Sequence, residues 1–369
     1  MSYKAKIMIP SFKGDESEYL KRAVESLEIS THGKNIDELT RLLKNYLSVK
    51  NALLVCNGTA AIHLALKSIG ISEGDIVFCP TITYCGTAYP ILYERAIPVF
   101  IDCNENGTLD PKALEKALLK YKDKLPRAVI AVDTYGAPSD YDEIKEILKK
   151  YNIPLIADSA ESLGGEYKGK KCGSLGDISI VSFSYSKLVT TSMGGAIFSD
   201  NDEVMEKASY LANQAKAKSP CYIHKEIGYN YLMSNVLAGM GISNMKRIDE
   251  LIERKKKIFE KYKQAFSGYD YIRMCSDVSG SSHWYNGIMT KKGDVNKIIR
   301  RLLDEGVEVR NGFNPMHNQA AFSGYDYVYE DNNSMKLFEQ TVLIPSGPGM
   351  SDDIQDFVID TVNNILGEI

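Results

Sequence analysis

Short apolar runs alternate with helix-like segments over residues 51–245. The runs are almost continuously apolar, as expected of strands that are buried on both faces of a sheet. The segments between them are typical of helices, and in one of them Asp110 stands as a cap before Pro111 at the first helical position. This alternation predicts an α/β fold with a mostly parallel central sheet flanked by helices. The expected strands are 51–56, 75–80, 97–102, 127–133, 153–158, 178–184 and 194–199.

The pattern changes near Lys246, where one long amphipathic helix is expected. We predict a large domain at residues 1–245, which includes the N-terminal segment, and a smaller C-terminal α+β domain at residues 246–369. The elements expected in the smaller domain are helices at 246–266, 295–306 and 351–366 and strands at 283–290 and 307–310.

Charge and cysteine content narrow the function classes. The net charge of −4 provides no global basic field for nucleic acid. The seven cysteines are odd in number and form no CxxC pair, so we expect neither a disulfide scaffold nor a zinc ribbon, and a reducing, cytoplasmic location. The five histidines form no HExxH motif, and no metal site is predicted.

No membrane anchor is expected. Met1 to Ser17 contains three lysines and no long apolar core, which argues against a signal peptide. Two uncharged runs, Ile76 to Tyr93 and Ile227 to Met245, are interrupted by proline or by asparagine and serine. We interpret both as buried core or active-site segments.

Two glycine-containing segments invite comparison with phosphate-binding loops. Asn57-Gly58-Thr59-Ala60 lies between a strand and a helix, where it serves either as a plain helix cap or as a phosphate site. Gly164 to Lys171 nearly matches the P-loop pattern but lacks the final Ser or Thr, and no helix pattern follows. It is interpreted as a glycine-rich turn.

Asp158 and Lys187 are the candidates for chemistry. Asp158 ends an expected strand, where its carboxylate could cap a helix, bind a metal or pair with a cofactor nitrogen. Lys187 follows the next buried strand, and partial desolvation there would lower its pKa and favour imine chemistry. Taken alone, an exposed loop lysine is the more common interpretation.

Together with their surroundings, these residues give a resemblance that covers almost the whole chain. The sequence resembles the DegT/StrS family of pyridoxal 5'-phosphate (PLP)-dependent nucleotide-sugar aminotransferases, which have the fold type I aminotransferase architecture. The segments that carry the resemblance are NGTAAIHLAL, GDIVFCPTITY, PVFID, ADSAESLGGEYKGKKCGSLGD, FSYSKLVTTSMGG, GYNYLMSNVLAGMGISNM, NPMH and IPSGPGMS.

The resemblance implies a set of cofactor contacts. Lys187 matches the Schiff-base lysine, which also moves the proton between substrate and cofactor. Asp158 matches the carboxylate that pairs with the pyridinium nitrogen, and Tyr84 the aromatic residue that stacks on the ring. Glu161 stands where the family has a polar residue beside the ring.

Phosphate and subunit contacts follow in the same way. Gly58, Thr59, Ala60 and Ser182 match the phosphate cradle of N–H and hydroxyl donors. Asn230 matches the asparagine of a loop that reaches the neighbouring subunit's cofactor. The resemblance therefore implies a homodimer in which the active site is shared across the interface.

On the substrate side, the resemblance implies contacts from Glu28, Ile29 and Ser30 and from the stretch Arg310 to His317. The implied reaction converts a 4-keto-6-deoxy nucleotide-sugar into its 4-amino sugar for a surface glycan such as an O-antigen, with L-glutamate as donor and 2-oxoglutarate as by-product. The GYNY and IPSG segments favour UDP-N-acetyl sugars. A GDP-perosamine synthase and an aminotransferase for dTDP-linked 3- or 4-keto sugars remain alternatives.

Three departures from the family pattern bear on the substrate. Met193 replaces an acidic residue, Leu232 replaces an arginine after Asn230-Tyr231, and Asp133-Thr134 stand where a histidine is usual. The related sugar dehydratases have histidine at the lysine position, so Lys187 argues against dehydration. A non-catalytic regulator is disfavoured by the complete cofactor set, and an NAD-linked enzyme by the missing GxGxxG motif.

Overall fold

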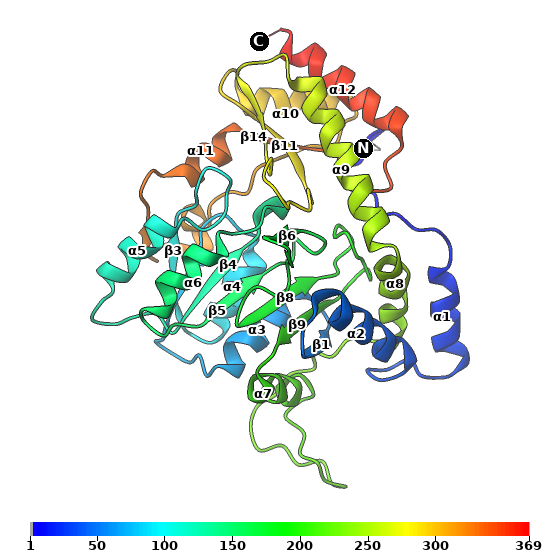
Figure 1. Cartoon of the computed structure of the whole chain (residues 1–369), viewed down its shortest axis with the longest axis vertical. Coiled ribbons are helices and arrows are strands. Elements are labelled where there is room, and N and C mark those ends of the chain that lie inside the picture. Colours follow the sequence, from blue (N-terminus) through cyan, green and yellow to red (C-terminus); the bar gives the residue numbers. More distant parts are fainter. Residues whose placement is uncertain (1–2, 369) are drawn as a thin grey trace.

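The computed structural model describes residues 3–368 and is built around one eight-stranded sheet (Figure 1). Its strand order is β1-β9-β8-β5-β4-β2-β3-β13. Only β9 runs antiparallel to its two neighbours, and every other neighbouring pair is parallel, as the sequence pattern predicts. The strands are β1 (Asn51–Val55), β2 (Ile76–Pro80), β3 (Ile97–Ile101), β4 (Ala128–Val132), β5 (Leu155–Asp158), β8 (Ile178–Ser182), β9 (Gly195–Ser199) and β13 (Tyr327–Val328).

Helices cover both faces of this sheet. Alternate residues of one strand enter different cores: Val77 and Cys79 pack on the face of α3, α4 and α7, whereas Ile76 and Phe78 pack on the face of α5 and α6. This two-residue period explains why each strand is apolar throughout. The helices are α3 (Gly58–Ser68), α4 (Cys85–Tyr93), α5 (Pro111–Lys120), α6 (Tyr141–Lys149) and α7 (Asp202–Ala212), with a short 3-10 turn at Thr134–Gly136.

The start of α5 has the expected cap. The Asp110 side chain accepts a hydrogen bond from the Lys112 N–H at 2.9 Å, with Pro111 at the first position of α5.

The Gly164–Lys171 segment forms the two-stranded hairpin β6 (Glu166–Tyr167) and β7 (Lys170–Lys171) rather than a phosphate loop. Its turn has φ of 49° at Lys168 and 80° at Gly169, which suits a glycine at the second position.

The C-terminal part contains a second, smaller sheet with the strand order β10-β11-β14-β12. The expected helix at 246–266 begins two residues later than predicted, because the chain breaks at Arg247 between α8 and α9. None of the helices within residues 3–368 is both long and apolar enough to cross a bilayer. The elements are α8 (Asn235–Lys246), α9 (Ile248–Phe266), β10 (Ile272–Met274), β11 (Asn286–Thr290), α10 (Val295–Asp304), β12 (Arg310–Asn311), α11 (Asn333–Gln340), β14 (Thr341–Ile344) and α12 (Asp352–Leu366), with short 3-10 turns at Met316–Asn318 and Ala320–Phe322.

Two segments cross the boundary expected near residue 245. Ala5 pairs with Val307, so the N-terminal segment packs on the smaller sheet before α1 (Glu16–Glu25) and α2 (Lys34–Leu47) return to α8. In the other direction, β13 joins the edge of the large sheet beside β3. The division into domains at residues 1–245 and 246–369 stays a prediction. Each predicted domain contributes one segment that packs on the other.

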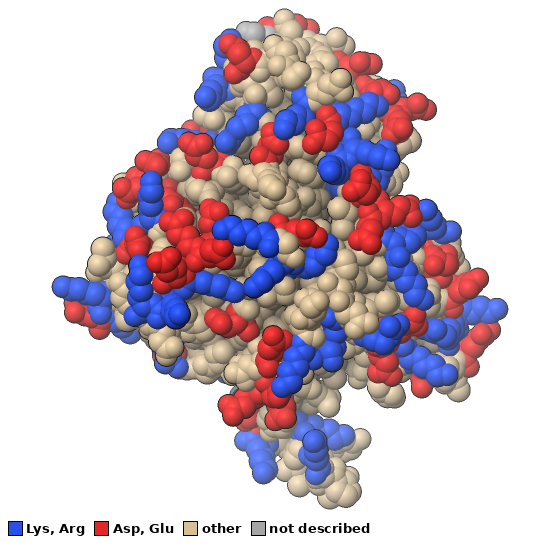
Figure 2. Space-filling model, in the orientation of Figure 1, with Lys and Arg blue, Asp and Glu red and all other residues tan. Residues whose placement is uncertain are grey.

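Surface charge is mixed in sign on the face that Figure 2 presents, where Lys and Arg side chains are interspersed with Asp and Glu. This distribution matches the small net charge of −4.

Candidate active site

A cavity of about 470 Å³ lies at the carboxyl ends of the parallel strands, where α/β proteins commonly bind ligands. Asp158 ends β5 and Ser182 ends β8, and both line it. The first turn of α3 and the loop after β8 form two more sides, and residues after α9 close it. Its lining includes Asn57, Gly58, Thr59, Tyr84, Thr87, Asp158, Glu161, Ser182, Tyr185, Lys187, Trp284, Tyr285, Arg310 and Phe313.

Lys187 projects into this cavity from the loop after β8, and only 12% of its side chain is exposed. Its amine lies 3.9 Å from Glu161 Oε1 and 3.4 Å from the centre of the Trp284 ring. Burial lowers the pKa of Lys187, and the carboxylates of Glu161 and Asp158 oppose that shift in part. A lysine with a lowered pKa has more of the neutral amine that can act as a nucleophile or base.

Asp158 faces the same cavity as a buried carboxylate held by two donors. Thr87 donates its hydroxyl to Oδ2 at 2.7 Å, and the Ala160 N–H donates to Oδ1 at 3.1 Å. Burial raises the pKa of Asp158, while these two hydrogen bonds and the charge of Lys187 act to lower it. The carboxylate is thus fixed in orientation and has further acceptor capacity for a cationic N–H group.

Glu161 lies beside Lys187 and is also buried. Its Oε2 accepts a hydrogen bond from the Tyr135 N–H at 2.7 Å, so the side chain is oriented by the backbone after β4. Burial raises the pKa of Glu161 to about 7, although Lys187 and the Tyr135 N–H favour the ionised form. Glu161 can therefore exchange a proton near neutral pH.

The start of α3 provides a cradle for an anion. The Asn57 side chain accepts from the Ala60 N–H at 2.8 Å, while Gly58 and Thr59 line the cavity with the positive end of the helix dipole. A Cβ at Gly58 would lie 3.1 Å from Ser182 Cβ, so glycine allows β8 to approach closely. Ala60 differs from the expectation, because its N–H is already bonded to Asn57 and its residue does not line the cavity.

The remaining predicted residues are divided between the cavity and other surfaces. Tyr84 stands at the rim with 63% of its surface exposed, and Arg310 lines the cavity while its guanidinium contacts Glu308 at 3.3 Å. His317 does not line it: its ring hydrogen-bonds Thr81 at 2.7 Å and stacks on Tyr327. The roles of these three residues stay predictions.

Glu28, Ile29, Ser30 and Asn230 also lie outside this chain's cavity. The backbone carbonyls of residues 28–30 accept hydrogen bonds from Ser234 and Asn235 at the start of α8. Asn230 is exposed and lies at the base of an arm, residues 213–230, that projects beyond α7 in Figure 1. Their predicted roles require a partner subunit or a bound sugar.

The sequence pattern missed several cavity residues. Thr87, which orients Asp158, is an ordinary residue within α4, and Trp284 and Tyr285 lie about 100 residues after Lys187. Their only sequence signal is the aromatic pair itself. The unusual Asp133 is buried and accepts hydrogen bonds from Ser139, Tyr141, Ser159 and Ser162, so it organises the loops rather than facing a ligand.

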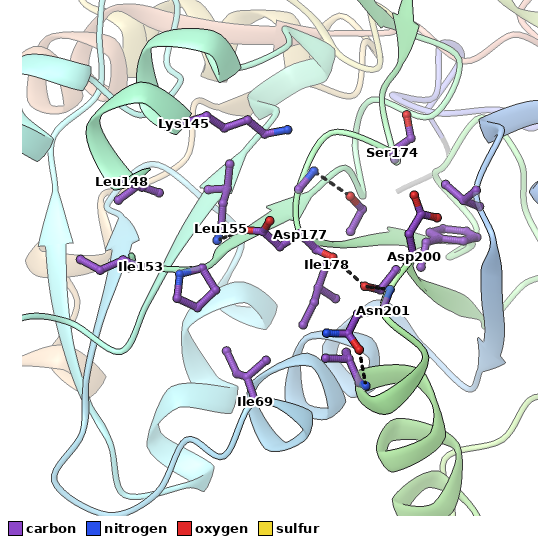
Figure 3. Close-up of a pocket in the computed structure, with 18 of the residues that line it drawn as sticks. Ile69, Lys145, Leu148, Ile153, Leu155, Ser174, Asp177, Ile178, Asp200 and Asn201 are labelled. Carbon is purple, nitrogen blue, oxygen red and sulfur yellow. Dashed lines mark hydrogen bonds between the residues drawn. The ribbon is translucent and has the colours of Figure 1, made fainter. Parts of the chain in front are cut away.

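A larger hollow of about 790 Å³ lies at the opposite, amino ends of β5 and β8 (Figure 3). Two of its polar side chains are engaged within the protein. Asp177 accepts from the Leu155 N–H at 2.8 Å, and Asn201 caps α7. Chemistry is therefore assigned to the smaller cavity, which gathers Lys187, Asp158 and Glu161.

The residues of the smaller cavity fit PLP. The buried Asp158 suits a protonated pyridine nitrogen, the start of α3 with Ser182 suits a phosphate, and the buried amine of Lys187 suits an aldehyde. A side chain at Gly58 would crowd Ser182, so glycine keeps these two parts of the cradle together.

Comparison with known proteins agrees with this reading. Residues 10–363 match the DegT/DnrJ/EryC1/StrS aminotransferase family. The chain is 39% identical over 366 residues to Bacillus subtilis EpsN, which is named as a pyridoxal phosphate-dependent aminotransferase, covering 97% of this chain and 94% of EpsN. It is 32% identical to GDP-perosamine synthase of Escherichia coli O157:H7, covering 97% of this chain and 98% of that enzyme.

Two further proteins support the same assignment. The UDP-4-amino-4,6-dideoxy-N-acetyl-beta-L-altrosamine transaminase of Campylobacter jejuni (strain 81-176) is 34% identical, covering 93% of this chain and 92% of that enzyme. The crystal structure of the aminotransferase TlmJ from Streptoalloteichus hindustanus superposes with a TM-score of 0.91 at 25% identity, covering 99% of both chains. The chain belongs to the DegT/DnrJ/EryC1/StrS family of PLP-dependent sugar aminotransferases.

Proposed function

We propose that this protein transfers the amino group of L-glutamate to the C4 carbonyl of a 4-keto-6-deoxy nucleotide-sugar. The observation that supports this most strongly is the placement of the Lys187 amine in one cavity with Asp158 and the start of α3. A lysine there meets the requirements of an aminotransferase and not those of the related dehydratases, which have histidine at this position.

PLP, when bound, supplies an aldehyde carbon that takes up and releases amino groups and a ring that accepts the electrons of the broken C–H bond. Asp158 keeps a proton on the ring nitrogen, since its fixed carboxylate favours a cationic partner. Gly58, Thr59 and Ser182 hold the phosphate through N–H and hydroxyl donors. Tyr84, at the rim of the cavity, would cover the ring.

Lys187 has two tasks in this proposal. Its Nζ holds the cofactor before the amino donor arrives, and as a free amine it moves a proton between the donor's Cα and the cofactor. The lowered pKa of Lys187 keeps a neutral fraction available for this role. Glu161, 3.9 Å away, receives or returns a proton as Lys187 changes charge.

For the sugar substrate, we favour a UDP-linked N-acetyl sugar. The Campylobacter jejuni relative is named for a UDP-linked 4-amino-4,6-dideoxy sugar and supports both features, while the Escherichia coli relative keeps GDP-perosamine synthesis as the alternative. Arg310 at the cavity mouth is a candidate for the diphosphate, because its guanidinium is cationic and exposed at the opening. Glu28, Ile29, Ser30 and His317 are proposed to cover the sugar once the site is closed.

A homodimer with a shared active site is part of the proposal. The arm at residues 213–230 exposes Tyr222 at 82% and Ile227 at 84%, apolar surface of the kind that a partner subunit covers. Asn230 at the base of this arm would reach the partner's cofactor. The seven free cysteines favour action in the cytoplasm, in the synthesis of a surface glycan.

A panel of 4-keto and 3-keto sugars linked to UDP, GDP and dTDP tests the substrate. Incubation with L-glutamate should release 2-oxoglutarate and give a 4-amino sugar with a UDP-linked N-acetyl compound, detected by mass spectrometry and NMR. Turnover with a 3-keto sugar alone would disprove the C4 assignment.

Subunit complementation tests the shared site. Lys187→Ala and Asn230→Ala proteins should each be impaired, whereas subunits mixed under exchange conditions should regain activity, because one site of each hybrid carries neither substitution. Absence of recovery despite proven subunit exchange would contradict the shared arrangement.

A further inference from the structure

Trp284 contacts both the side chain of Lys187 and the backbone of the residue before it. The free amine of Lys187 lies over the indole ring, 3.4 Å from its centre. The indole Nε1–H donates to the backbone carbonyl of Ser186 at 2.8 Å, which is the peptide that precedes Lys187. One aromatic side chain therefore fixes both the main chain at the root of the lysine and the amine at its tip.

The position of Trp284 is itself fixed from the C-terminal part of the chain. The buried Lys255 of α9 donates from Nζ to the Trp284 carbonyl at 2.8 Å and also to the Ser346 carbonyl. Trp284 is 7% exposed and packs against Tyr285 with ring centres 4.1 Å apart. The indole cannot change rotamer without disturbing this packing, so it presents a rigid surface to Lys187.

The proposed function requires such a surface. Lys187 leaves the cofactor when the amino donor takes its place. Its amine must then stay within reach of the cofactor and must not turn towards solvent. An aromatic face attracts an ammonium group, and the Glu161 carboxylate lies 3.9 Å from the same amine. The Ser186 contact prevents the loop from carrying the lysine away.

We infer that Trp284 is a positioning residue for Lys187. After the lysine has left the cofactor, the indole face holds its amine in place near Glu161 during the amino-transfer half-reactions. The inference rests on the proposed function for its catalytic meaning, but the contact itself is a property of the cofactor-free protein.

The first experiment uses intrinsic fluorescence, because Trp284 is the only tryptophan of the 369 residues. The emission of cofactor-free wild type should differ from that of Lys187→Gln, because the cation over the ring is lost, whereas Lys187→Arg should remain closer to wild type. Lys50→Gln is the matched control, since Lys50 is exposed and pairs with Asp202. Superimposable spectra for wild type and Lys187→Gln would overturn the inference.

The second experiment separates positioning from packing. PLP-loaded protein is mixed with L-glutamate without sugar, and conversion of the cofactor is followed by stopped-flow absorbance. Trp284→Leu should slow the maximal rate by about tenfold, the combined effect of a lost cation–π contact and a lost hydrogen bond. Trp284→Phe, which keeps a ring but lacks the N–H, should fall between Leu and wild type.

The glutamate concentration for half-maximal rate should change by no more than about twofold, because the proposed role concerns the released lysine rather than substrate binding. Unchanged maximal rates in both variants would refute the positioning role of Trp284, even if their melting temperatures fall. If a Trp284 variant does not fold, the Lys187→Gln fluorescence still decides. Failure of wild type to attach PLP at Lys187 would instead refute the proposed function, with the fluorescence comparison unaffected.

Discussion

Gly195 offers a sharp test of the phosphate cradle, since alanine at this position has no room. Gly195 begins β9 and pairs with Val55 on one side and Ser182 on the other. An added Cβ would lie 2.7 Å from the Asn57 carbonyl carbon and 2.8 Å from the Gly58 nitrogen. Both are backbone atoms at the start of α3, so no side chain can rotate away to relieve the contact.

Gly195→Ala must therefore displace the first turn of α3 or the start of β9. Overpacking of this kind costs about 1–3 kcal/mol. At 1.36 kcal/mol for each factor of ten, we expect PLP to bind about five- to 150-fold more weakly, because the displaced peptide belongs to the phosphate cradle. The unfolding free energy of the cofactor-free protein should decrease by a similar amount, about 1–3 kcal/mol.

The assay is titration of cofactor-free protein with PLP, followed by absorbance, beside denaturant unfolding of the same samples. Gly268→Ala is the matched control: it makes the same chemical change where an added Cβ meets nothing within 4 Å. Equal PLP affinity for wild type, Gly195→Ala and Gly268→Ala would refute the assignment of this turn to the phosphate.

Three further substitutions test the site and the loops that support it. Burial raises the pKa of Glu161 from its ordinary 4.5 to about 7 in the folded protein. Folding therefore takes up a proton between these two pH values, and the stability of the cofactor-free protein should fall as the pH rises through that window. Glu161→Gln should flatten this fall in denaturant unfolding series, and an unchanged slope would contradict the burial argument. Asp133→Ala leaves four buried donors unpaired and should lower the unfolding free energy by about 3–5 kcal/mol; a loss below 1 kcal/mol would show that water replaces the carboxylate. Asp158→Asn keeps an acceptor for the Ala160 N–H, while its NH2 group can donate to the Thr87 hydroxyl in place of the bond that Thr87 now donates. Because the charge is lost, kcat should fall about 100-fold or more while PLP remains bound, and normal turnover would argue against a pyridinium partner.

Local patterns predict much of the large sheet because its strands are buried on both faces and because three of the flanking helices, α3, α5 and α7, have side-chain caps. For the α8 region the sequence predicts a buried core or active-site segment and not a helix, and its composition explains why. Gly239 and Gly241 lower its intrinsic helix propensity, yet an added Cβ at either would lie within 3 Å of Asn35 or of Thr191. The helix exists because small residues let its neighbours approach, which is a tertiary effect that a linear pattern does not contain.

In the candidate site, too, some residues are placed by the strand pattern and others by tertiary packing. Lys187, Asp158 and Ser182 follow strand ends, so the topology of a parallel sheet brings them to one edge. Trp284 and Arg310 reach the cavity only after the C-terminal part has folded against the large sheet. Likewise, the position of His317 against Thr81 and Tyr327 depends on how β13 joins the sheet edge, and the sequence alone could not give it.

The central claim is that Lys187 carries the cofactor. Reduction of PLP-loaded protein with borohydride, followed by digestion and mass spectrometry, tests it directly. We predict that the phosphopyridoxyl mass is found on the peptide containing Lys187 and is absent from Lys187→Arg protein. Attachment at another lysine, such as the buried Lys255, whose pKa burial lowers to about 7, or persistent labelling of Lys187→Arg, would contradict the account.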